Sequence, residues 1–448
     1  MKTLHVVHLI DTEGPLYESF NAHFERVYEI FGHKIEATRD NLAKLKSGSM
    51  DLSGDEEKIK ELLSDSRISM NSTWDQIDRM LDIITTEKYR KQITDSFGSG
   101  WIYNWMCMSH VGFTGNNPRR RDIGYFNIYD HFKEYLDSNN DTNDLLQWHY
   151  HALSLTNDAN RAGSTYLNSS HIYDILSRGI IDKLWFPTVF RAGHNTIRPD
   201  SHWFLEQWIP FDYSNARIKQ GFNHNSLSRE RYGDWHDAPA SWVPYQPSHA
   251  NHKVIGNCNR FIARCLSIDD RGYSIQKEDI IDAFEEASSR GNAIFAVTNH
   301  DFRNMQPDID QIRNQLQEVS VDYPDVKIKY SNAIDAMRAT LNLDSGNKPG
   351  LKAEIIEIGN YKKLIVHAES NLFGPQPYLA IKTKNNDYFW QNFDFVDTKS
   401  WSYSFDIDNL LIEQVSKIGI AANSNSGVTE IIKIDPHLNV TSKHILNS

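Results

Sequence analysis

The sequence predicts an α/β protein in which a parallel sheet or barrel precedes an all-β region. From Asp144 to about residue 340, short apolar runs alternate with amphipathic stretches, as in successive βα units. Well before them, the apolar run Leu4–Ile10 supplies a first strand. After residue 347, seven short runs alternate apolar and polar residues at close spacing, which is typical of a β-sandwich.

Composition and charge exclude several classes of protein. Hydrophobic residues make up 40% of the 448 residues, which favours folded domains, two or three at this length, over disorder. The net charge of -12 argues against general binding of nucleic acid or anionic membranes, although Arg119–Arg121 form a local basic segment. No apolar run is long enough to span a membrane.

The N-terminus and the cysteines both indicate the cytoplasm. The chain opens with Lys2 and enters an apolar strand at once, so it lacks the successive charged, apolar and small-residue regions of a signal peptide. Three cysteines, Cys107, Cys258 and Cys265, are odd in number and have no metal-knuckle spacing. We therefore expect reduced thiols and a cytoplasmic location.

A long insertion, at about residues 16–143, is expected after the first strand. Its first part is polar and shows helical apolar spacing, for example over Trp74–Ile84. Its last part, Gly98–His131, is rich in aromatic residues. Such residues suit either core packing or a wall that stacks on sugar rings. The candidates for substrate binding in this segment are Trp101, Trp105 and Tyr125.

The remaining elements of the α/β region follow in order. The predicted strands are Leu145–Leu153, Leu184–Arg191, Val254–Leu266, Ala293–Thr298 and Val326–Tyr330. The predicted helices are Ser169–Ser177, Lys277–Ser289 and Asp308–Val319. Residues 1–345 would then form one domain, and the linker Asn347–Gly350 would lead to an all-β domain over residues 350–448. The all-β domain is expected to be a structural appendage, or to bind sugar through Tyr378, Tyr388 and Trp390.

Two pairs of polar residues end predicted strands. Asp11 and Glu13 follow the first strand, and His149 and His151 lie in a later one. Residues two apart on a strand share a face, so each pair points to one side. Chemistry in βα folds lies at the carboxyl ends of the strands, so we expect the two pairs to meet there. Two imidazoles and a carboxylate form a site for a divalent metal with one open position.

Two further segments carry candidate catalytic groups. Arg191 ends an apolar run and can hold a buried carboxylate and lower its pKa, or form a purely structural ion pair. His300 ends another apolar run, and histidine is the commonest general acid. The adjacent Asp301 could orient a histidine or cap the chain. Two lower-ranked candidates for ligand contact are Asp212 and Tyr245.

Together these segments resemble the polysaccharide deacetylase superfamily (NodB-like, carbohydrate esterase family 4). The family carries an Asp motif after its first strand, a histidine-pair motif, an Arg motif and a late Leu-x-His motif. The resemblance covers roughly residues 1–15 and 144–335. It implies a distorted (β/α) barrel, a divalent metal that is usually zinc, and removal of N- or O-acetyl groups from sugars.

The resemblance also implies individual roles. Asp11 matches the catalytic base, Arg191 the residue that holds the base, and His300 the catalytic acid. The implied metal ligands are Glu13, His149 and His151. Two motifs depart from the usual pattern. Asp-Thr-Glu replaces an adjacent Asp-Asp pair, and His-Tyr-His replaces His-x-x-x-His, with Leu153 at the position of the second histidine.

The implied function is therefore metal-dependent deacetylation of an acetylated sugar. In the cytoplasm the substrate would be a saccharide precursor, such as a lipid- or nucleotide-linked sugar. Two alternatives stay open. One is a catalytically degenerate barrel that serves as a carbohydrate-binding or scaffold protein, and the other is a hydrolase of a different C–N bond. A stoichiometric cation at the histidine pair would argue against the degenerate barrel.

Overall fold

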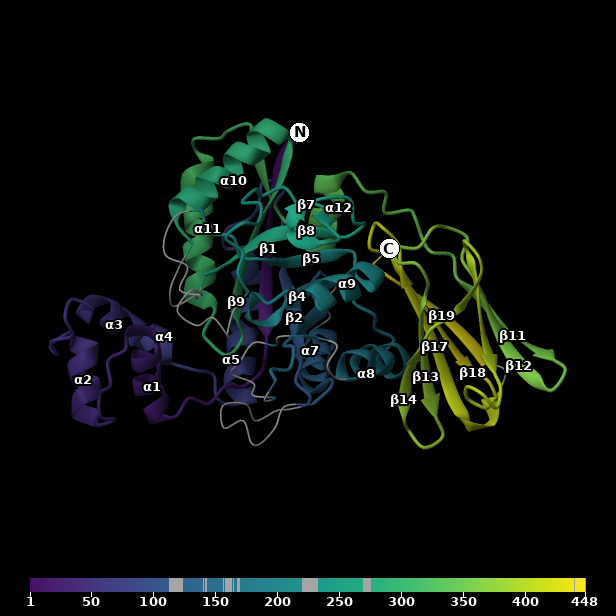
Figure 1. Cartoon of the computed structure of the whole chain (residues 1–448). Helices are drawn as coiled ribbons and strands as arrows, with labels where there is room; N and C mark the ends of the chain where they lie inside the picture. The colour runs from purple at the N-terminus through teal and green to yellow at the C-terminus, as the bar shows by residue number, and fades with distance from the viewer. Residues whose placement is uncertain are drawn as a thin grey trace.

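The computed structural model shows an α/β barrel beside a group of antiparallel sheets (Figure 1). It describes residues 1–112, 124–139, 141, 143–155, 157, 163, 165–166, 170–219, 233–268, 275–438 and 440–447. The basic segment Arg119–Arg121 and the predicted helix start Ser169 lie outside these residues. Within them, none of the helices has the length and apolarity needed to cross a membrane.

Seven parallel strands close into a barrel. In spatial order they are β1 (Lys2–Thr12), β2 (Tyr103–Ser109), β3 (Leu145–Tyr150), β4 (Val189–Ala192), β5 (Phe211–Asn215), β8 (Phe261–Ser267) and β9 (Asn292–His300). The ring closes because β9 pairs with β1 over Thr3–Asp11. An eighth strand, β10 (Val326–Tyr330), pairs with the first residues of β1. The predicted parallel α/β architecture is confirmed, as a barrel.

Alternate strand residues fill the barrel. Val7 and Leu9 of β1 belong to an interior cluster, and helix α12 (Ala333–Leu341) contributes to the same cluster. The other interior residues are Met106, Val189, Phe211, Tyr213, Ala263, Cys265, Ile294 and Ala296. The hydroxyl of Tyr213 donates to the carbonyl of Ala333 at 2.7 Å. The alternation of β1 continues from Val7 and Leu9 to Asp11 and Glu13, so these polar residues point inward at the carboxyl end of the strand.

Helices cover the outside of the barrel. They are α7 (Asn127–Ser138), α8 (His171–Arg178), the π-helix η1 (Gly179–Lys183), α9 (Pro199–Trp208), α10 (Lys277–Arg290) and α11 (Gln306–Ser320). A hairpin of β6 (Pro247–Ser248) and β7 (Asn251–Ile255) precedes β8. The predicted strand Val254–Leu266 is therefore two elements. Strands β2 and β5 were not predicted, and β2 lies within the expected insertion.

The insertion has its own small core. Helices α1 (Phe20–Phe31), α2 (Arg39–Ser47), α3 (Glu56–Leu62) and α4 (Asp65–Ile68) lie to one side of the barrel (Figure 1). Their buried side chains form a separate cluster that includes Phe24, Val27 and Ile59. Helices α5 (Trp74–Ile84) and α6 (Glu87–Arg90) instead contribute to the main core.

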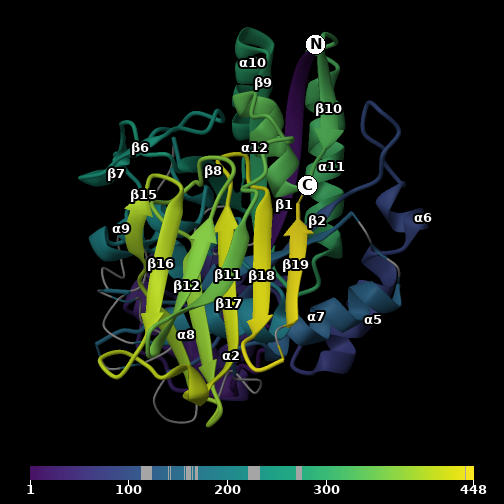
Figure 2. The same cartoon turned by 90° about the vertical axis from the view of Figure 1, so that its right-hand side faces the viewer.

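Two antiparallel sheets make up the C-terminal region, seen face-on in Figure 2. One contains β11 (Lys352–Ile358), β12 (Tyr361–His367), β16 (Ser400–Phe405) and β15 (Asp394–Asp397). The other contains β14 (Tyr388–Gln391), β13 (Tyr378–Thr383), β17 (Val415–Asn423), β18 (Thr429–Asp435) and β19 (Val440–Leu446). Both sheets contribute to one buried cluster. All seven predicted strands are present, and β15 and β19 are additional.

Aromatic residues of the C-terminal sheets attach them to the barrel. The hydroxyl of Tyr378 donates to the carbonyl of Tyr173 in α8 at 2.9 Å, and the ring of Trp390 stacks on Tyr173 at 4.4 Å. The Arg178 guanidinium lies 4.0 Å from the ring centre of Tyr388. These aromatic groups were candidates for sugar binding. In the structure they pack between α8 and the sheets, which favours a structural role.

Buried histidines make the fold sensitive to acid. Burial is the largest cause that lowers the pKa of His5 and His202 to about 4, that of His110 to about 3, and that of the half-buried His252 to about 3, from 6.5. Between pH 6.5 and 4 the unfolded chain therefore binds protons that the folded chain does not. The contribution of these histidines to the free energy of unfolding is fully present above pH 6.5. It decreases as the pH falls, by about 2 kcal/mol per histidine at pH 5.

Urea unfolding at pH 7, 6 and 5 checks this prediction. The free energy of unfolding should decrease steadily as the pH is lowered from 7 to 5. His5→Gln, which retains a side-chain partner for the hydroxyl of Ser331 2.9 Å away, should reduce the fall by about 2 kcal/mol. Equal stability of the unaltered protein at pH 7 and pH 5 would contradict the prediction.

Candidate metal centre

The acidic turn after β1 lies at the carboxyl end of the barrel. Asp11 and Glu13 continue the inward-pointing alternation of Val7 and Leu9, and each is only 4% exposed. Gly14 then adopts a φ of +71°, which favours glycine. The chain therefore leaves the barrel directly after presenting both carboxylates to its interior.

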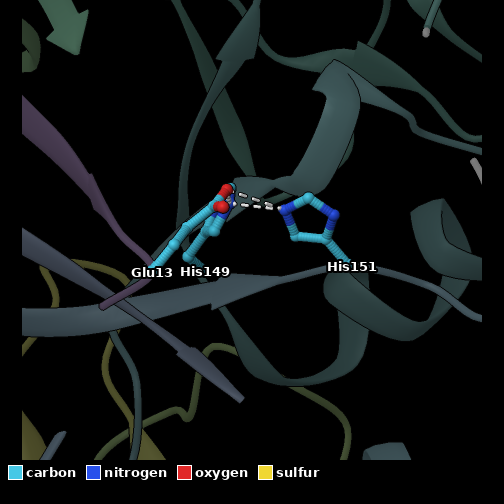
Figure 3. Close-up of side chains that lie close together, drawn as sticks. All are labelled: Glu13, His149 and His151. Atoms are coloured by element: carbon cyan, nitrogen blue, oxygen red, sulfur yellow. Dashed lines mark hydrogen bonds and ion pairs between the residues drawn. The ribbon is translucent and has the colours of Figure 1, made fainter. Parts of the chain in front are cut away.

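The two histidines of β3 meet Glu13, as the sequence predicts. The Nε2 atoms of His149 and His151 lie 3.0 Å apart. Glu13 Oε1 lies 3.5 Å from His149 Nε2 and 3.2 Å from His151 Nε2. Figure 3 shows the ring of His151 directed at the other two side chains. These three buried groups could hold a metal ion.

The donor atoms fit a single divalent cation. A tetrahedral ion with bonds of about 2.0–2.1 Å keeps its ligand atoms about 3.3 Å apart, close to the observed separations. His149 Nδ1 lies 3.0 Å from the carbonyl oxygen of Arg191. Nδ1 therefore donates to that carbonyl, and Nε2 keeps its lone pair toward Glu13 and His151. Burial is also the largest cause that lowers the pKa of His149 to about 4, so the ring is neutral at pH 7, as metal binding requires.

The turn after β4 packs against the ring of His151. The ring of His194 meets that of His151 edge-on, with centres 4.5 Å apart. His194 and Asn195 both have positive φ, 53° and 50°, an uncommon conformation for residues other than glycine. The indole N–H of Trp235 donates to the carbonyl of Asn195 at 2.8 Å and helps to hold the turn. No role was predicted for His194 or Trp235, and the sequence signal nearest to this turn is the adjacent Gly193.

That neighbour, Gly193, leads to a prediction. A Cβ atom at this position would lie 2.3 Å from His151 Cδ2, so Gly193→Ala must displace the ring. We expect zinc affinity to fall by at least about 10-fold, measured by competition with a chromophoric chelator. Gly346→Ala is the control, because its Cβ would meet only the carboxylate end of Asp344, at 3.1 Å. Unchanged zinc affinity in Gly193→Ala would contradict the assigned role of His151.

Arg191 binds Asp11 as the sequence predicts. Its Nε donates to Asp11 Oδ1 at 2.6 Å, and its Nη1 donates to the carbonyl of Tyr213 at 2.9 Å. Burial alone would raise the pKa of Asp11. The positive charge of Arg191 and its hydrogen bond outweigh burial and leave this pKa below its ordinary value. Asp11 is therefore an ionised carboxylate next to the candidate metal ligands.

His300 faces the same group from the next strand. The register of β1 and β9 pairs it with Asp11. Its Nε2 lies 3.9 Å from Asp11 Oδ2 and 4.0 Å from Glu13 Oε1. The side chain of His300 is 26% exposed, whereas those of Asp11 and Glu13 are nearly buried. Of these three, His300 is the one best placed to reach a bound molecule.

Trp101 and Trp105 are not part of this site. Both are fully buried in the main core on the outer side of the barrel. The indole N–H of Trp101 donates to His8 Nδ1, and that of Trp105 donates to Asp144 Oδ2, each at 3.0 Å. Trp105 points outward because its neighbour Met106 points into the barrel. The core-packing alternative is correct for these two residues.

The other predicted substrate contacts also lie elsewhere. Asp212 is fully buried and accepts from Arg260 on the outer face of β5, because the adjacent Phe211 and Tyr213 point inward. The Tyr245 hydroxyl donates to the carbonyl of His252 at 2.8 Å. The Tyr125 hydroxyl donates to Asp174 Oδ2 at 3.2 Å, and its ring packs under a guanidinium of α8.

A second group combines His202, Glu206 and Cys258. Glu206 Oε1 lies 2.8 Å from His202 Nε2 and 2.9 Å from Cys258 Sγ. The guanidinium of Arg260, which can only donate, faces His202 Nδ1. Nδ1 therefore accepts, and Nε2 carries the ring proton and has no lone pair for a cation. We interpret this group as a hydrogen-bond network that ties the loop before β8 to α9.

Comparison with known proteins adds no family. No protein-family model matches the sequence, and no curated protein matches it. The barrel, the buried triad and the Asp11–Arg191 pair are therefore the basis for a functional proposal.

Proposed function

We propose that this protein is a metal-dependent hydrolase that removes an acetyl group from an N- or O-acetylated saccharide or saccharide precursor. The observation that carries the proposal is the convergence of Glu13, His149 and His151 beside an ionised Asp11 and an accessible His300. A cation site flanked by a base and an acid suits hydrolysis of an acyl group. The acetylated sugar follows from the resemblance of the motifs to polysaccharide deacetylases.

Glu13, His149 and His151 would hold the cation. Zinc is the proposed ion, because two imidazoles and one carboxylate are a common zinc ligand set with an open position. When bound, a divalent cation polarises an acyl carbonyl and makes water a stronger acid.

Asp11 acts as the general base in this proposal. Arg191 binds Oδ1, so proton uptake is assigned to Oδ2, the oxygen that faces His300. Its lowered pKa keeps Asp11 ionised and ready to accept a proton from the attacking water. Arg191 also fixes the direction of the carboxylate, since its own guanidinium is anchored to the carbonyl of Tyr213.

His300 acts as the general acid. As a protonated ring it gives its Nε2 proton to the departing amine or alkoxide, whose bond to the acyl carbon breaks. Its partial exposure suits contact with a leaving group that extends away from the buried ligands.

Metal analysis and an acetate-release assay test the proposal together. Purified protein should contain about one equivalent of divalent metal, and it should release acetate from acetylated oligosaccharides. Removal of the metal by a chelator should abolish release, and added zinc should restore it. Protein that binds no cation, before or after addition of zinc, would overturn the proposal and favour the degenerate, sugar-binding barrel.

A further inference from the structure

The side chain of Asp301 holds the backbone of the acidic turn. It is fully buried. Its Oδ1 accepts from the backbone N–H of Glu13 at 2.8 Å, and its Oδ2 accepts from the backbone N–H of Gly14 at 2.9 Å. Hydrogen bonds from backbone N–H groups to a carboxylate are charge-assisted and stronger than neutral ones.

Glu13 needs this support because it lies beyond the strand ladders. The pairing of β1 with β9 ends at Asp11, and the pairing of β1 with β2 ends at Thr12. Asp11 and Thr12 are therefore fixed by the sheet, whereas the next residue is not. Among the described contacts, the backbone N–H of Glu13 is bound by Asp301 instead of by a neighbouring strand.

Asp301 is itself well anchored. It directly follows His300 at the end of β9. The side-chain amide of Asn71 donates to its carbonyl oxygen at 3.0 Å, and the backbone N–H of Asn71 donates to the carbonyl of Phe302 at 2.7 Å. The segment that carries the proposed acid thus also fixes the turn that carries a proposed metal ligand.

We propose that Asp301 is a positioning residue that holds Glu13 in place and so sets the metal affinity of the site. This inference rests on the proposed metal site. Outer partners of metal ligands typically change metal affinity by about 10–100-fold. Asp301 binds the backbone of its ligand, so its loss should free the turn and leave the carboxylate of Glu13 chemically unchanged.

Asp301→Asn is the test variant. Asparagine has the same size, but its NH₂ group would face one of the two backbone N–H donors and lose that bond. We expect zinc affinity, measured by chelator competition, to fall by about 10–100-fold. The matched control is Asp95→Asn. Asp95 is also buried and accepts from the backbone N–H groups of Phe97, Ser99 and Tyr330 at 2.9, 2.8 and 3.1 Å.

Both variants should lower the melting temperature, but only Asp301→Asn should weaken zinc binding. Should Asp301→Asn fail to fold, Asp301→Ser is measured with the same expectation, because its hydroxyl can accept one bond. A folded Asp301 variant that binds zinc as tightly as the unaltered protein would overturn only the positioning role of Asp301, and not the proposed metal site. If neither Asp301→Asn nor Asp301→Ser folds, the positioning role of Asp301 is overturned in favour of a purely structural role. Absence of zinc binding in the unaltered protein would overturn the proposed function itself.

Discussion

Asp11→Asn is expected to lower the turnover number about 10³-fold while zinc stays bound. Asparagine keeps an oxygen that accepts from Arg191, but it cannot take a proton from water at neutral pH. Asp11 is not one of the three candidate ligands, so zinc content and zinc affinity should be unchanged. Acetate release per mole of zinc-loaded protein is the measurement.

The chain offers a closely matched control for this variant. Asp212 is also a buried carboxylate paired with a buried arginine, Arg260, but on the outer face of the barrel. Breaking either pair leaves an uncompensated buried charge, so both variants should lose about 3–5 kcal/mol of stability. Asp212→Asn should nevertheless keep its turnover. Unchanged turnover in Asp11→Asn, or an equal loss in both variants, would refute the assigned base.

The main part of the site could be predicted because strand alternation is local. Asp11 with Glu13, and His149 with His151, share a face through a two-residue spacing that is visible in the sequence. Parallel strands then bring their carboxyl ends together without further information. Arg191 and His300 were candidates because each ends an apolar run, and the structure places both within 4.0 Å of the acidic pair.

Two of the predicted substrate contacts, Trp105 and Asp212, lie on the outer face of the barrel, because alternation fixes a spacing but not a direction. Tyr103–Ser109 is buried on both faces, so its aromatic residues give no sign of which side points into the barrel. The same holds for Asp212, which lies between two inward-pointing apolar neighbours. The bonds of Asp301 to the acidic turn span 287 and 288 residues of sequence, a contact that no local pattern reveals.

His149→Ala is expected to abolish the proposed zinc binding and, with it, nearly all acetate release. His149 is the most deeply buried of the three candidate ligands, and the carbonyl of Arg191 fixes its tautomer, so alanine removes a lone pair that already points at the proposed ion site. His202→Ala is the matched control, because His202 is an equally buried histidine of the second group, whose ring proton excludes metal binding. It should keep one zinc per chain, as measured by elemental analysis. If His202→Ala loses zinc and His149→Ala retains it, the ion binds to the second group, at α9, and not to the proposed site. The pair of variants therefore tests which of two similar clusters binds the ion, a choice that depends on which ring nitrogen carries the proton.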